Sequence, residues 1–568
     1  MASYSGSTDR HTKNLSDESE LSVSSTESII DASHPFRLGF PAPLPNFPTP
    51  HFTADDNPLV DREEIIQTIT SLLKQRDITW GTIVVVSRRT SATISDRRPT
   101  IIITAPAVEN DSWYLVLKDI QEYLLKNSLD KICVEIHDPE GLKIPAHFPV
   151  EAEHPIVSVW PKLLEDIVTV LEPALWHSVS AVRRGYNNNA RLNPVTIVIT
   201  SKYPMELSLS RPTIQFRCRQ YRLEKIDVCF VKVEAILSAG GFQFPDEGRD
   251  FALSTDLSPG SSIGLSSEPR ATGTLGGKII VQREDIFHEV GVTNFHVISS
   301  DPGVQGFKDT GLTPENATNL NVSLLSPSNF DTNFKQETIE KALESIRGHI
   351  ESFCAKYGTD QLNEKQQGIL AKLQANADVL RTEVQSLNTF ERAAGTVWAG
   401  SGLRSANTFG MDWALVSVPS QRPFANKLPA SEEFSALPGH FFDTMLLPES
   451  GEIEEYGVCA KGTEVFKRGR TTGLTQGTLS HIDCAVNING RVMSAWQVIG
   501  SFNNPFSDKG DSGSWVINAE GKWVGLLFAC PFPSCTGDGY VMPVSELVKD
   551  IETLVGGEVV SPAKETSG

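Results

Sequence analysis

The sequence lacks several features that would commit it to a membrane, to export or to a metal. None of its 568 residues lies in an apolar run of about 18 residues, the length that crosses a membrane. The N-terminus, Met-Ala-Ser-Tyr-Ser-Gly-Ser-Thr, has no basic start followed by an apolar run, so we expect no secretory signal. The spacings Cys-x-x-Cys, His-Glu-x-x-His and Gly-x-x-x-x-Gly-Lys are also absent. We therefore expect no metal, no cofactor and no contact with a membrane.

Positive charge and cysteine are both scarce. The chain carries 50 Lys and Arg against 70 Asp and Glu, a formal net charge of −20. Because phosphate contact needs clustered Lys and Arg, we expect no nucleic-acid partner. The eight cysteines are spread along the chain, and without an export signal they predict reduced thiols and an intracellular location, cytoplasmic or nuclear. Cys530 and Cys535 are close enough in sequence to form a bridge if the chain were exported.

Changes in composition predict five regions. Residues 1–50 are rich in Ser and Pro with few apolar side chains, and we expect them to be disordered. Residues 51–236 alternate β-branched strands with amphipathic helices and predict an α/β domain. Residues 237–257 lie in a run dominated by Gly, Ser, Pro and acidic residues, which is typical of a linker. A β-rich domain over 258–555 and a disordered tail over 556–568 complete the chain.

The region 51–236 has clear periodicity but no chemical motif. Ile65, Ile69 and Leu73 share one face of a helix whose first turn Asp61 could cap. Further helices are expected at 111–126 and 160–176, and strands at 82–87, 100–104, 131–137, 195–200 and 226–233. Because these patterns carry no catalytic residues, we expect this domain to recognise substrates or to restrain the rest of the chain.

Residues 258–555 have the short strands and frequent turns of an all-β barrel, with one helical interruption. Over 333–390 apolar residues recur at helical spacing in two runs, separated by Tyr357-Gly-Thr-Asp360. Glycine ends helices and Thr or Asp begins them, so this segment predicts a helical hairpin inserted into the barrel. The hairpin either decorates a barrel loop or serves as a lid or as a docking arm for a regulatory protein partner.

The most informative motif is Gly510-Asp-Ser-Gly-Ser514. A serine hydroxyl becomes a useful nucleophile only when a base takes its proton and nearby donors hold the oxyanion. Gly510 can adopt backbone angles that aim successive N–H groups into one space, and Gly513 leaves the approach to Ser512 clear. The motif therefore predicts a catalytic serine, which needs a base and an acid from elsewhere in the chain.

His296 and Asp412 are the candidates for that base and that acid. His296 ends an apolar strand, a position where a histidine is more often structural, as His288 illustrates. Asp412 enters an apolar strand between a methionine and a tryptophan, where an unpaired carboxylate would be costly to bury. Alone, Asp412 could simply cap a turn. Together with His296 and Ser512 it supplies the acid of a nucleophile, base and acid set.

In this chain order the three residues resemble the triad of the trypsin-like (chymotrypsin-fold) serine peptidases. Gly510–Gly513 matches the Gly-Asp-Ser-Gly motif of that family, and Thr293-Asn-Phe-His-Val297 resembles the histidine motif of its intracellular, HtrA-like members. Gly273-Thr-Leu-Gly-Gly277 resembles an opening strand of the class, and Phe466–Thr478 is similar to a segment of plant and fungal proteins of the narrow-leaf type. The resemblance covers residues 258–555 and implies a double β-barrel protease domain.

The resemblance also implies roles for particular residues. His296 would be the general base, Asp412 its orienting acid and Ser512 the nucleophile, with the N–H groups of Gly510 and Ser512 forming the oxyanion hole. The substrate pocket would be lined by Phe506, Phe528, Ala529, Cys530 and Gly539. Because Phe506 stands where trypsins carry a specificity acid, we expect cleavage after small or medium apolar residues rather than after Lys or Arg.

Three departures from the family pattern matter. No Ile-Val-Gly-Gly sequence precedes the barrel, so Asp511 needs a partner other than a freed N-terminus, and a backbone turn is one. The interval between the base and the acid is long for the family, and removing the insert at 333–390 restores an ordinary length. Arg468 and Arg470 lie in a glycine-rich run, where they either support a turn or contact an acidic substrate or partner.

The sequence as a whole predicts an intracellular serine endopeptidase that cuts protein substrates through an acyl-enzyme. The alternative is a catalytically weak protease-fold adaptor that docks partners through the α/β domain and the hairpin. The sequence leaves open whether the linker is itself cut to free the protease domain.

Overall fold

The computed structural model describes residues 29–34, 36–42, 44, 51–52, 62–89, 97–107, 111–139, 145–237, 253–358, 362–435, 437, 445–500, 504–532 and 536–564. The chain forms two compact units, residues 1–91 with 96–142 and residues 92–95 with 143–568. The α/β region expected over 51–236 is therefore divided near residue 142, and its second half belongs to the same unit as the β-rich region. Most of the expected linker and most of the first fifty residues lie outside the described residues.

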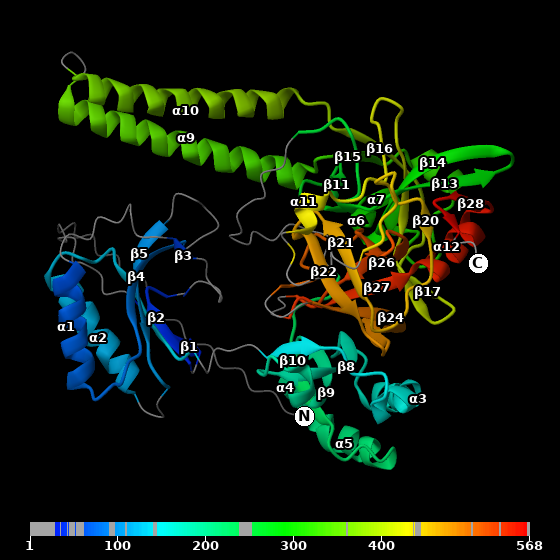
Figure 1. The fold of residues 1–568 in the computed structure, drawn as a ribbon, viewed down its shortest axis with the longest axis horizontal. Coiled ribbons are helices and arrows are strands. Elements are labelled where there is room, and N and C mark those ends of the chain that lie inside the picture. The colour runs from blue at the N-terminus through cyan, green and yellow to red at the C-terminus, as the bar shows by residue number, and fades with distance from the viewer. Residues whose placement is uncertain are drawn as a thin grey trace, which may run out of the picture. The chain divides into compact units, whose positions relative to one another are not determined.

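The first unit is a six-stranded sheet with two helices packed against it (Figure 1). The order is β1-β2-β6-β5-β4-β3, with β5 and β6 parallel and the other neighbours antiparallel. The prediction of disorder over 1–50 is wrong for Asp31–His34 and Arg37–Phe40, which form β1 and β2. The remaining elements are β3 His51–Phe52, α1 Arg62–Gln75, β4 Ile83–Arg89, β5 Arg97–Thr104, α2 Ser112–Lys126 and β6 Cys133–His137.

A buried charge cluster lies within this sheet. Glu135 on β6 is 1 % exposed, and its Oε2 accepts hydrogen bonds from Arg37 at 2.8 Å and from Arg88 at 2.5 Å. Nδ1 of His137 lies 3.2 Å from its other oxygen. Burial alone would raise the pKa of Glu135, but hydrogen bonds from His137 and Arg37 and the charge of Arg88 hold that pKa at about 2. The carboxylate therefore stays ionised and balances two cations.

The second unit begins with a small sheet that continues into a barrel. Strands β7 Ala146–Phe148, β8 Ser178–Gly185, β9 Val195–Ser201 and β10 Asp227–Lys232 pair in the order β7-β8-β9-β10, and β8 also pairs with β23 Cys484–Ile488. Buried side chains join the same two regions, with His147 Nδ1 at 2.7 Å from Asp538 and Ser178 Oγ at 2.7 Å from the Tyr540 hydroxyl. Helices α3 Pro155–Val170, α4 Pro204–Leu207 and α5 Arg211–Gln220 complete this part.

Two β-barrels follow. In the first, β12 and β13 are separated only by Gly276 and Gly277, so its strands form a ring. These strands are β11 Ser261–Leu265, β12 Gly273–Leu275, β13 Lys278–Arg283, β14 Ile286–Thr293, β15 Ser323–Leu325, β16 Ala393–Gly400 and β19 Ala414–Ser417. The second barrel is a closed ring of β21 Glu464–Gly469, β22 Gly473–Leu479, β24 Arg491–Gly500, β27 Gly539–Pro543, β26 Trp523–Ala529 and β25 Trp515–Asn518.

The two barrels meet at a tryptophan. A Cβ added to Gly277 would lie 2.2 Å from the Trp515 ring, and one added to Gly276 would lie 2.4 Å from it. Only glycine lets the first barrel approach the ring this closely. Trp515 is buried and stacks on Trp523, with ring centroids 4.1 Å apart. This contact brings β12 of the first barrel beside the chain that leads into β25 of the second.

Between β15 and β16 the chain forms two long helices that lie side by side (Figure 1), α9 Asn329–Tyr357 and α10 Glu364–Thr389. Ser328 caps α9 by accepting the Asp331 N–H, and Gly358 ends the helix at a φ of 71°. Asn363 caps α10, whereas Thr359 and Asp360, which we expected at its start, lie outside the described residues. A Lys335–Glu383 ion pair of 2.7 Å joins the helices.

The remaining described elements are short, apart from α12. They are α6 Phe295–Ile298, α7 Pro302–Gln305, α8 Pro314–Leu320, β17 Arg404–Ala406, β18 Phe409–Met411, α11 Ser431–Phe434, β20 Glu455–Tyr456, α12 Val544–Val555, β28 Glu558–Ser561 and β29 Ala563–Lys564. Because β28 pairs with β13, the prediction of a disordered tail over 556–568 is wrong for its first part. Among the described helices, none has both the length and the apolar character needed to cross a membrane.

The charge cluster of the first unit generates a stability prediction. Substituting Glu135→Gln leaves Arg88, which is 1 % exposed, without a counter-charge, so the first unit should lose about 3 kcal/mol or more of stability at pH 7. Because the pKa of Glu135 is depressed, its contribution is present above the unfolded pKa and is lost as the pH falls toward 2.

Hydrogen exchange of β5 and β6 in the full-length chain measures this loss. Asp119→Asn is the matched control, because the side chain of its partner Arg76 is 37 % exposed and can be solvated, so that the exchange of both strands should stay unchanged. Equal protection in Glu135→Gln and in the wild type would show that the cluster is not needed for the stability of this unit.

Candidate active site

His296 and Asp412 are brought together by the first barrel. His296 lies in α6, directly after β14, and Asp412 lies between β18 and β19. Nδ1 of His296 is 2.5 Å from Oδ2 of Asp412, and the backbone N–H of His296 donates to Oδ1 at 2.8 Å. Asn294 adds a hydrogen bond from its side-chain amide to the Asp412 carbonyl at 2.5 Å. Both oxygens of a carboxylate that is 1 % exposed therefore bind one histidine, Oδ2 through its imidazole and Oδ1 through its backbone N–H.

The serine turn before β25 has the backbone form expected of an oxyanion hole. Gly510 and Gly513 have φ angles of 95° and 99°, which favour glycine. The N–H groups of Asp511, Gly513 and Ser514 donate to backbone carbonyls. Those of Gly510 and Ser512 donate to none of the residues that the structure describes. The two N–H groups named from the sequence are thus the two that remain available.

Strand β12 holds the histidine segment and the serine turn next to each other. A Cβ placed on Gly273 would lie 2.5 Å from the Val297 side chain and 3.2 Å from the Ser512 carbonyl. The Thr274 N–H donates to that same carbonyl at 2.8 Å, and its own carbonyl accepts from the Thr293 hydroxyl at 2.8 Å. The residue after His296 and the backbone of Ser512 therefore both lie against the same residue, Gly273, of one short strand.

The Ser512 hydroxyl itself is turned toward β26. It donates to the Phe528 carbonyl at 3.4 Å, and Ser512 is 8 % exposed. Nε2 of His296 is buried and has no hydrogen-bond partner among the described residues. The structure thus contains the histidine–aspartate contact, and it does not contain a hydrogen bond between Ser512 and His296.

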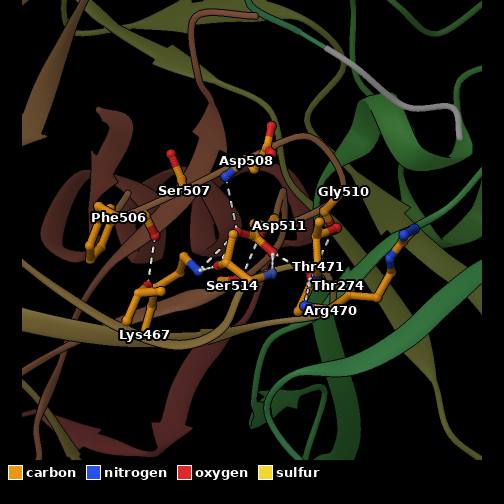
Figure 2. Close-up of polar contacts among 12 residues, drawn as sticks. Thr274, Lys467, Arg470, Thr471, Phe506, Ser507, Asp508, Gly510, Asp511 and Ser514 are labelled. Carbon is orange, nitrogen blue, oxygen red and sulfur yellow. Dashed lines mark hydrogen bonds and ion pairs between the residues drawn. The ribbon is translucent and has the colours of Figure 1, made fainter. Parts of the chain in front are cut away.

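Asp511 is fully buried beside the serine and is paired with a lysine (Figure 2). Nζ of Lys467, also 0 % exposed, lies 2.9 Å from Oδ2 of Asp511. The Thr472 hydroxyl donates to the same oxygen at 2.6 Å, and the N–H groups of Thr471 and Thr472 donate to Oδ1 at 2.9 and 3.1 Å. Burial alone would raise the pKa of Asp511, but Lys467 and the hydrogen bonds from Thr472 hold it below its ordinary value.

Reasoning from the sequence identified only part of this arrangement. We expected a backbone turn as the partner of Asp511, and two backbone N–H groups do bind it, but Lys467 was missed. Lys467 lies on β21 between buried Phe466 and Arg468, and a lysine in the apolar part of a strand was the available signal. Gly469 makes the pair possible, because a Cβ there would lie 2.3 Å from the Asp511 carboxylate.

The residues expected to line the substrate pocket are all buried. Phe506 is 0 % exposed and packs in the interior of the second barrel with Val498 and Leu527. Phe528 and Ala529 end β26, and a Cβ on Gly539 would lie 2.9 Å from the Phe506 ring. Cys530 follows β26, and burial raises the pKa of its thiol. The structure therefore places these residues around the strand end that the Ser512 hydroxyl touches.

The arginines of the glycine-rich run have partners within the chain. Arg468 pairs with Glu433 on α11. Arg470 donates to Thr272 at 3.1 Å, and its Nη2 lies 3.4 Å from the carboxylate of Asp331 at the start of α9. Both side chains thus support the fold, one of the two roles expected of them.

The described residues hold no group of three or more His, Cys, Asp or Glu side chains that could bind a metal ion. Seven cysteines are free thiols, and Cys535, the bridging candidate for Cys530, lies outside the described residues. Next to the serine turn, burial lowers the pKa of Lys509 to about 8.

Solved structures with a related arrangement are distant in sequence. A glutamic-acid-specific serine protease with a histidine triad in substrate binding is 13 % identical and matches over 53 % of this chain and 100 % of its own, with a TM-score of 0.26. Protease A of Thermobifida fusca is 12 % identical over 54 % of this chain and 99 % of its own, with a TM-score of 0.26. The Nocardiopsis protease NAPase is 12 % identical over 54 % of this chain and 98 % of its own, with a TM-score of 0.27.

At these TM-scores the likeness assigns no function to this chain. No curated protein matches the sequence. The family model described as Peptidase family S64 does match, over residues 242–538. That span is a little over half of the 568 residues, and it contains His296, Asp412 and Ser512. The chain therefore belongs to peptidase family S64 and is a serine endopeptidase.

Proposed function

We propose that the protein hydrolyses internal peptide bonds of protein substrates through an acyl-enzyme formed on Ser512. The observation that carries this proposal is the buried His296–Asp412 contact, held next to the serine turn because Val297 packs against β12 and β12 binds the Ser512 carbonyl. Asp412 fixes the imidazole by its Nδ1 and leaves Nε2 without another partner among the described residues. An imidazole held in this way is suited to accept a proton at Nε2.

In the proposed reaction the Ser512 Oγ attacks the carbonyl carbon of the substrate while its proton passes to Nε2 of His296. The carbonyl oxygen becomes an oxyanion that the N–H groups of Gly510 and Ser512 bind. When the C–N bond breaks, the leaving amine takes the proton from His296 and the acyl group stays on Ser512. Water then attacks the ester by the same route in reverse, which frees the acid product and restores the serine.

This mechanism requires one local change. The Ser512 hydroxyl must rotate about χ1 from the Phe528 carbonyl toward His296, which exchanges a 3.4 Å hydrogen bond for one to the imidazole. Rotations between staggered side-chain positions are fast and cost little when the hydrogen bond given up is long. The loose apo geometry is compatible with catalysis, because such contacts often tighten only when substrate binds.

The same geometry favours a second candidate function, a protease-fold adaptor with weak activity. Its support is the missing Ser512–His296 hydrogen bond and the burial of every expected pocket side chain.

The preference for apolar substrates is a prediction based on Phe506. The HtrA-like or narrow-leaf-type branch and the intracellular location are also predictions from the sequence. Regulation by a protein partner, through the N-terminal region or the helical hairpin, is part of the same proposal.

Control by the N-terminal region is supported by a strand-like contact beside the expected pocket. Ala235 and Phe532 form an antiparallel bridge, with the Phe532 N–H donating to the Ala235 carbonyl at 2.9 Å. The Cys530 N–H donates to the Ile236 carbonyl at 3.0 Å. Extended peptides bind to exposed strand edges by such bonds, so residues 234–236 take an edge that a substrate could use.

The proposed nucleophile is tested with a fluorophosphonate probe on the full-length chain. Wild-type protein should be labelled at Ser512, and Ser512→Ala should abolish the labelling because no other activated hydroxyl is predicted. His296→Ala should slow labelling by about 1,000-fold or more, since the triad acts as a unit. Wild-type protein that stays unlabelled under all conditions would favour the adaptor.

The proposed control is tested by displacing residues 234–236. Ile236 is 4 % exposed, and Ile236→Asp would bury a charge, so the segment should leave the edge and the labelling rate at Ser512 should rise by about tenfold or more. Leu192→Asp is the control, because Leu192 belongs to the same region and is 68 % exposed. Identical rates in Ile236→Asp, Leu192→Asp and wild type would remove this segment from the regulation.

A further inference from the structure

The direction of the Gly510 N–H is set by a neighbouring hydroxyl. The Thr471 side chain donates to the Lys509 carbonyl at 2.7 Å. Lys509 and Gly510 share one planar peptide group, in which the C=O and the N–H point in opposite directions. Because the hydroxyl holds the carbonyl end, the N–H of Gly510 is directed away from Thr471. If the Lys509–Gly510 peptide group flipped, the hydrogen bond from Thr471 would be lost and the Gly510 N–H would no longer point into the proposed oxyanion hole.

Three further hydrogen bonds fix the same turn (Figure 2). The Thr274 hydroxyl donates to the Gly510 carbonyl at 2.9 Å and accepts from the Arg470 N–H at 3.0 Å. The Thr471 N–H donates to the Asp511 carboxylate at 2.9 Å. Residues 470 and 471 therefore hold the peptide before Gly510, the peptide after it and the buried acid.

Arg470 connects this turn to the helical hairpin. Its guanidinium lies against Gly510, where an added Cβ would be 3.1 Å from Cζ. The same group lies over the Phe330 ring, 5.5 Å from the centroid, and 3.4 Å from the Asp331 carboxylate, both in the first turn of α9. The Arg470 and Asp331 side chains are only 13 % and 15 % exposed, so solvent screens their attraction little.

Asp331 is itself fixed to the first barrel. Its carboxylate accepts hydrogen bonds from Ser328, the cap of α9, and from Ser262 on β11. Ser328 also bonds the Thr272 hydroxyl at 2.9 Å, which in turn accepts from Arg470. A closed network of side chains thus joins the start of α9 to the loop that supports the serine turn.

We propose that Thr471 is a positioning residue that directs the oxyanion-binding N–H of Gly510, and that Arg470 anchors this turn to the first turn of α9 through Asp331. The inference rests on the proposed function, because the direction of this N–H matters only if Ser512 is acylated. It assigns to the base of the helical hairpin a part in setting the geometry of the reaction centre.

The test measures fluorophosphonate labelling of the full-length chain, separated into a maximal rate and a half-saturating probe concentration. Thr471→Val keeps the shape and removes the hydroxyl. Its maximal rate should fall at least tenfold, toward the loss of about 100-fold that follows removal of an oxyanion donor. The half-saturating concentration and the pH midpoint of labelling should not change, because the lost interaction acts in the transition state. Thr471→Ser should restore the rate.

Thr553→Val is the matched control, since the Thr553 hydroxyl makes a similar bond, to the Lys549 carbonyl, at an exposed position of α12 and its loss should change nothing. Asp331→Asn tests the hairpin connection without altering the turn, and it should lower the maximal rate by roughly threefold. This test of the connection to α9 does not depend on whether Thr471→Val folds.

Each outcome has a distinct meaning. Wild-type rates in Thr471→Val would overturn the positioning role, and wild-type rates in Asp331→Asn would overturn the connection to α9. A shifted pH midpoint in Thr471→Val would instead assign the effect to the histidine. Absence of labelling in the wild type would contradict the proposed function rather than this inference alone.

Discussion

The arrangement of the serine turn depends on one buried ion pair, between Lys467 and Asp511. Both side chains are 0 % exposed, and placing two charges out of water is costly unless each has a close partner. Asp511 has five donors, which are Lys467, the Thr472 hydroxyl and the N–H groups of Asp508, Thr471 and Thr472. Because the pKa of Asp511 is depressed, the ion pair is present at neutral pH. It is lost only when the pH falls below the ordinary pKa range of a carboxyl group.

The Lys467–Asp511 pair holds the serine turn from within the second barrel, and the first barrel holds it through β12. β21 carries Lys467 and the turn that follows it, so the second barrel supplies both the countercharge and the Thr471 hydroxyl. β12 of the first barrel binds the Ser512 and Gly510 carbonyls through Thr274. The proposed reaction centre therefore lies at the junction of two barrels, and both barrels hold the peptide groups that set the direction of the Gly510 and Ser512 N–H groups.

In the resemblance to trypsin-like enzymes, a freed N-terminus performs the task that Lys467 performs in this chain. A lysine inside a strand is present as soon as the barrel folds, so no cleavage is needed to create the positive charge. Regulation would then act on the access of substrate to Ser512 and on the exact positions of the groups around it. We propose that residues 234–236 at the strand edge control access and that the Arg470–Asp331 contact controls geometry.

The serine turn and the β-rich character of 258–555 could be predicted because both are local. Glycine spacing determines the turn, and strand periodicity is visible in a single sequence. The strands expected at 82–87 and 195–200 overlap β4 and β9 for the same reason. The family model that includes Gly510–Gly513 supports the enzyme class at which this local motif pointed.

Contacts between distant segments could not be predicted. No local pattern in the sequence predicts that β8 pairs with β23. The composition therefore predicts one domain over 51–236, although the chain divides near 142. Lys467 reads as an ordinary strand lysine until Asp511, far along the chain, is placed beside it. The sequence predicts that Phe506 lines a pocket, but its ring fills the interior of the second barrel. Each of these contacts is set by tertiary packing, which produces no periodic pattern in the sequence.

The central claim is that Lys467 holds the serine turn in its working form. Hydrogen exchange of the full-length Lys467→Met variant tests it most directly, with the segment 508–514 compared with β13 and β14 in the same molecule. The account predicts that 508–514 loses protection, by about 3 kcal/mol, because Asp511 is left as an unpaired buried charge, while β13 and β14 keep theirs. Protection of 508–514 equal to that of the wild type would contradict the account.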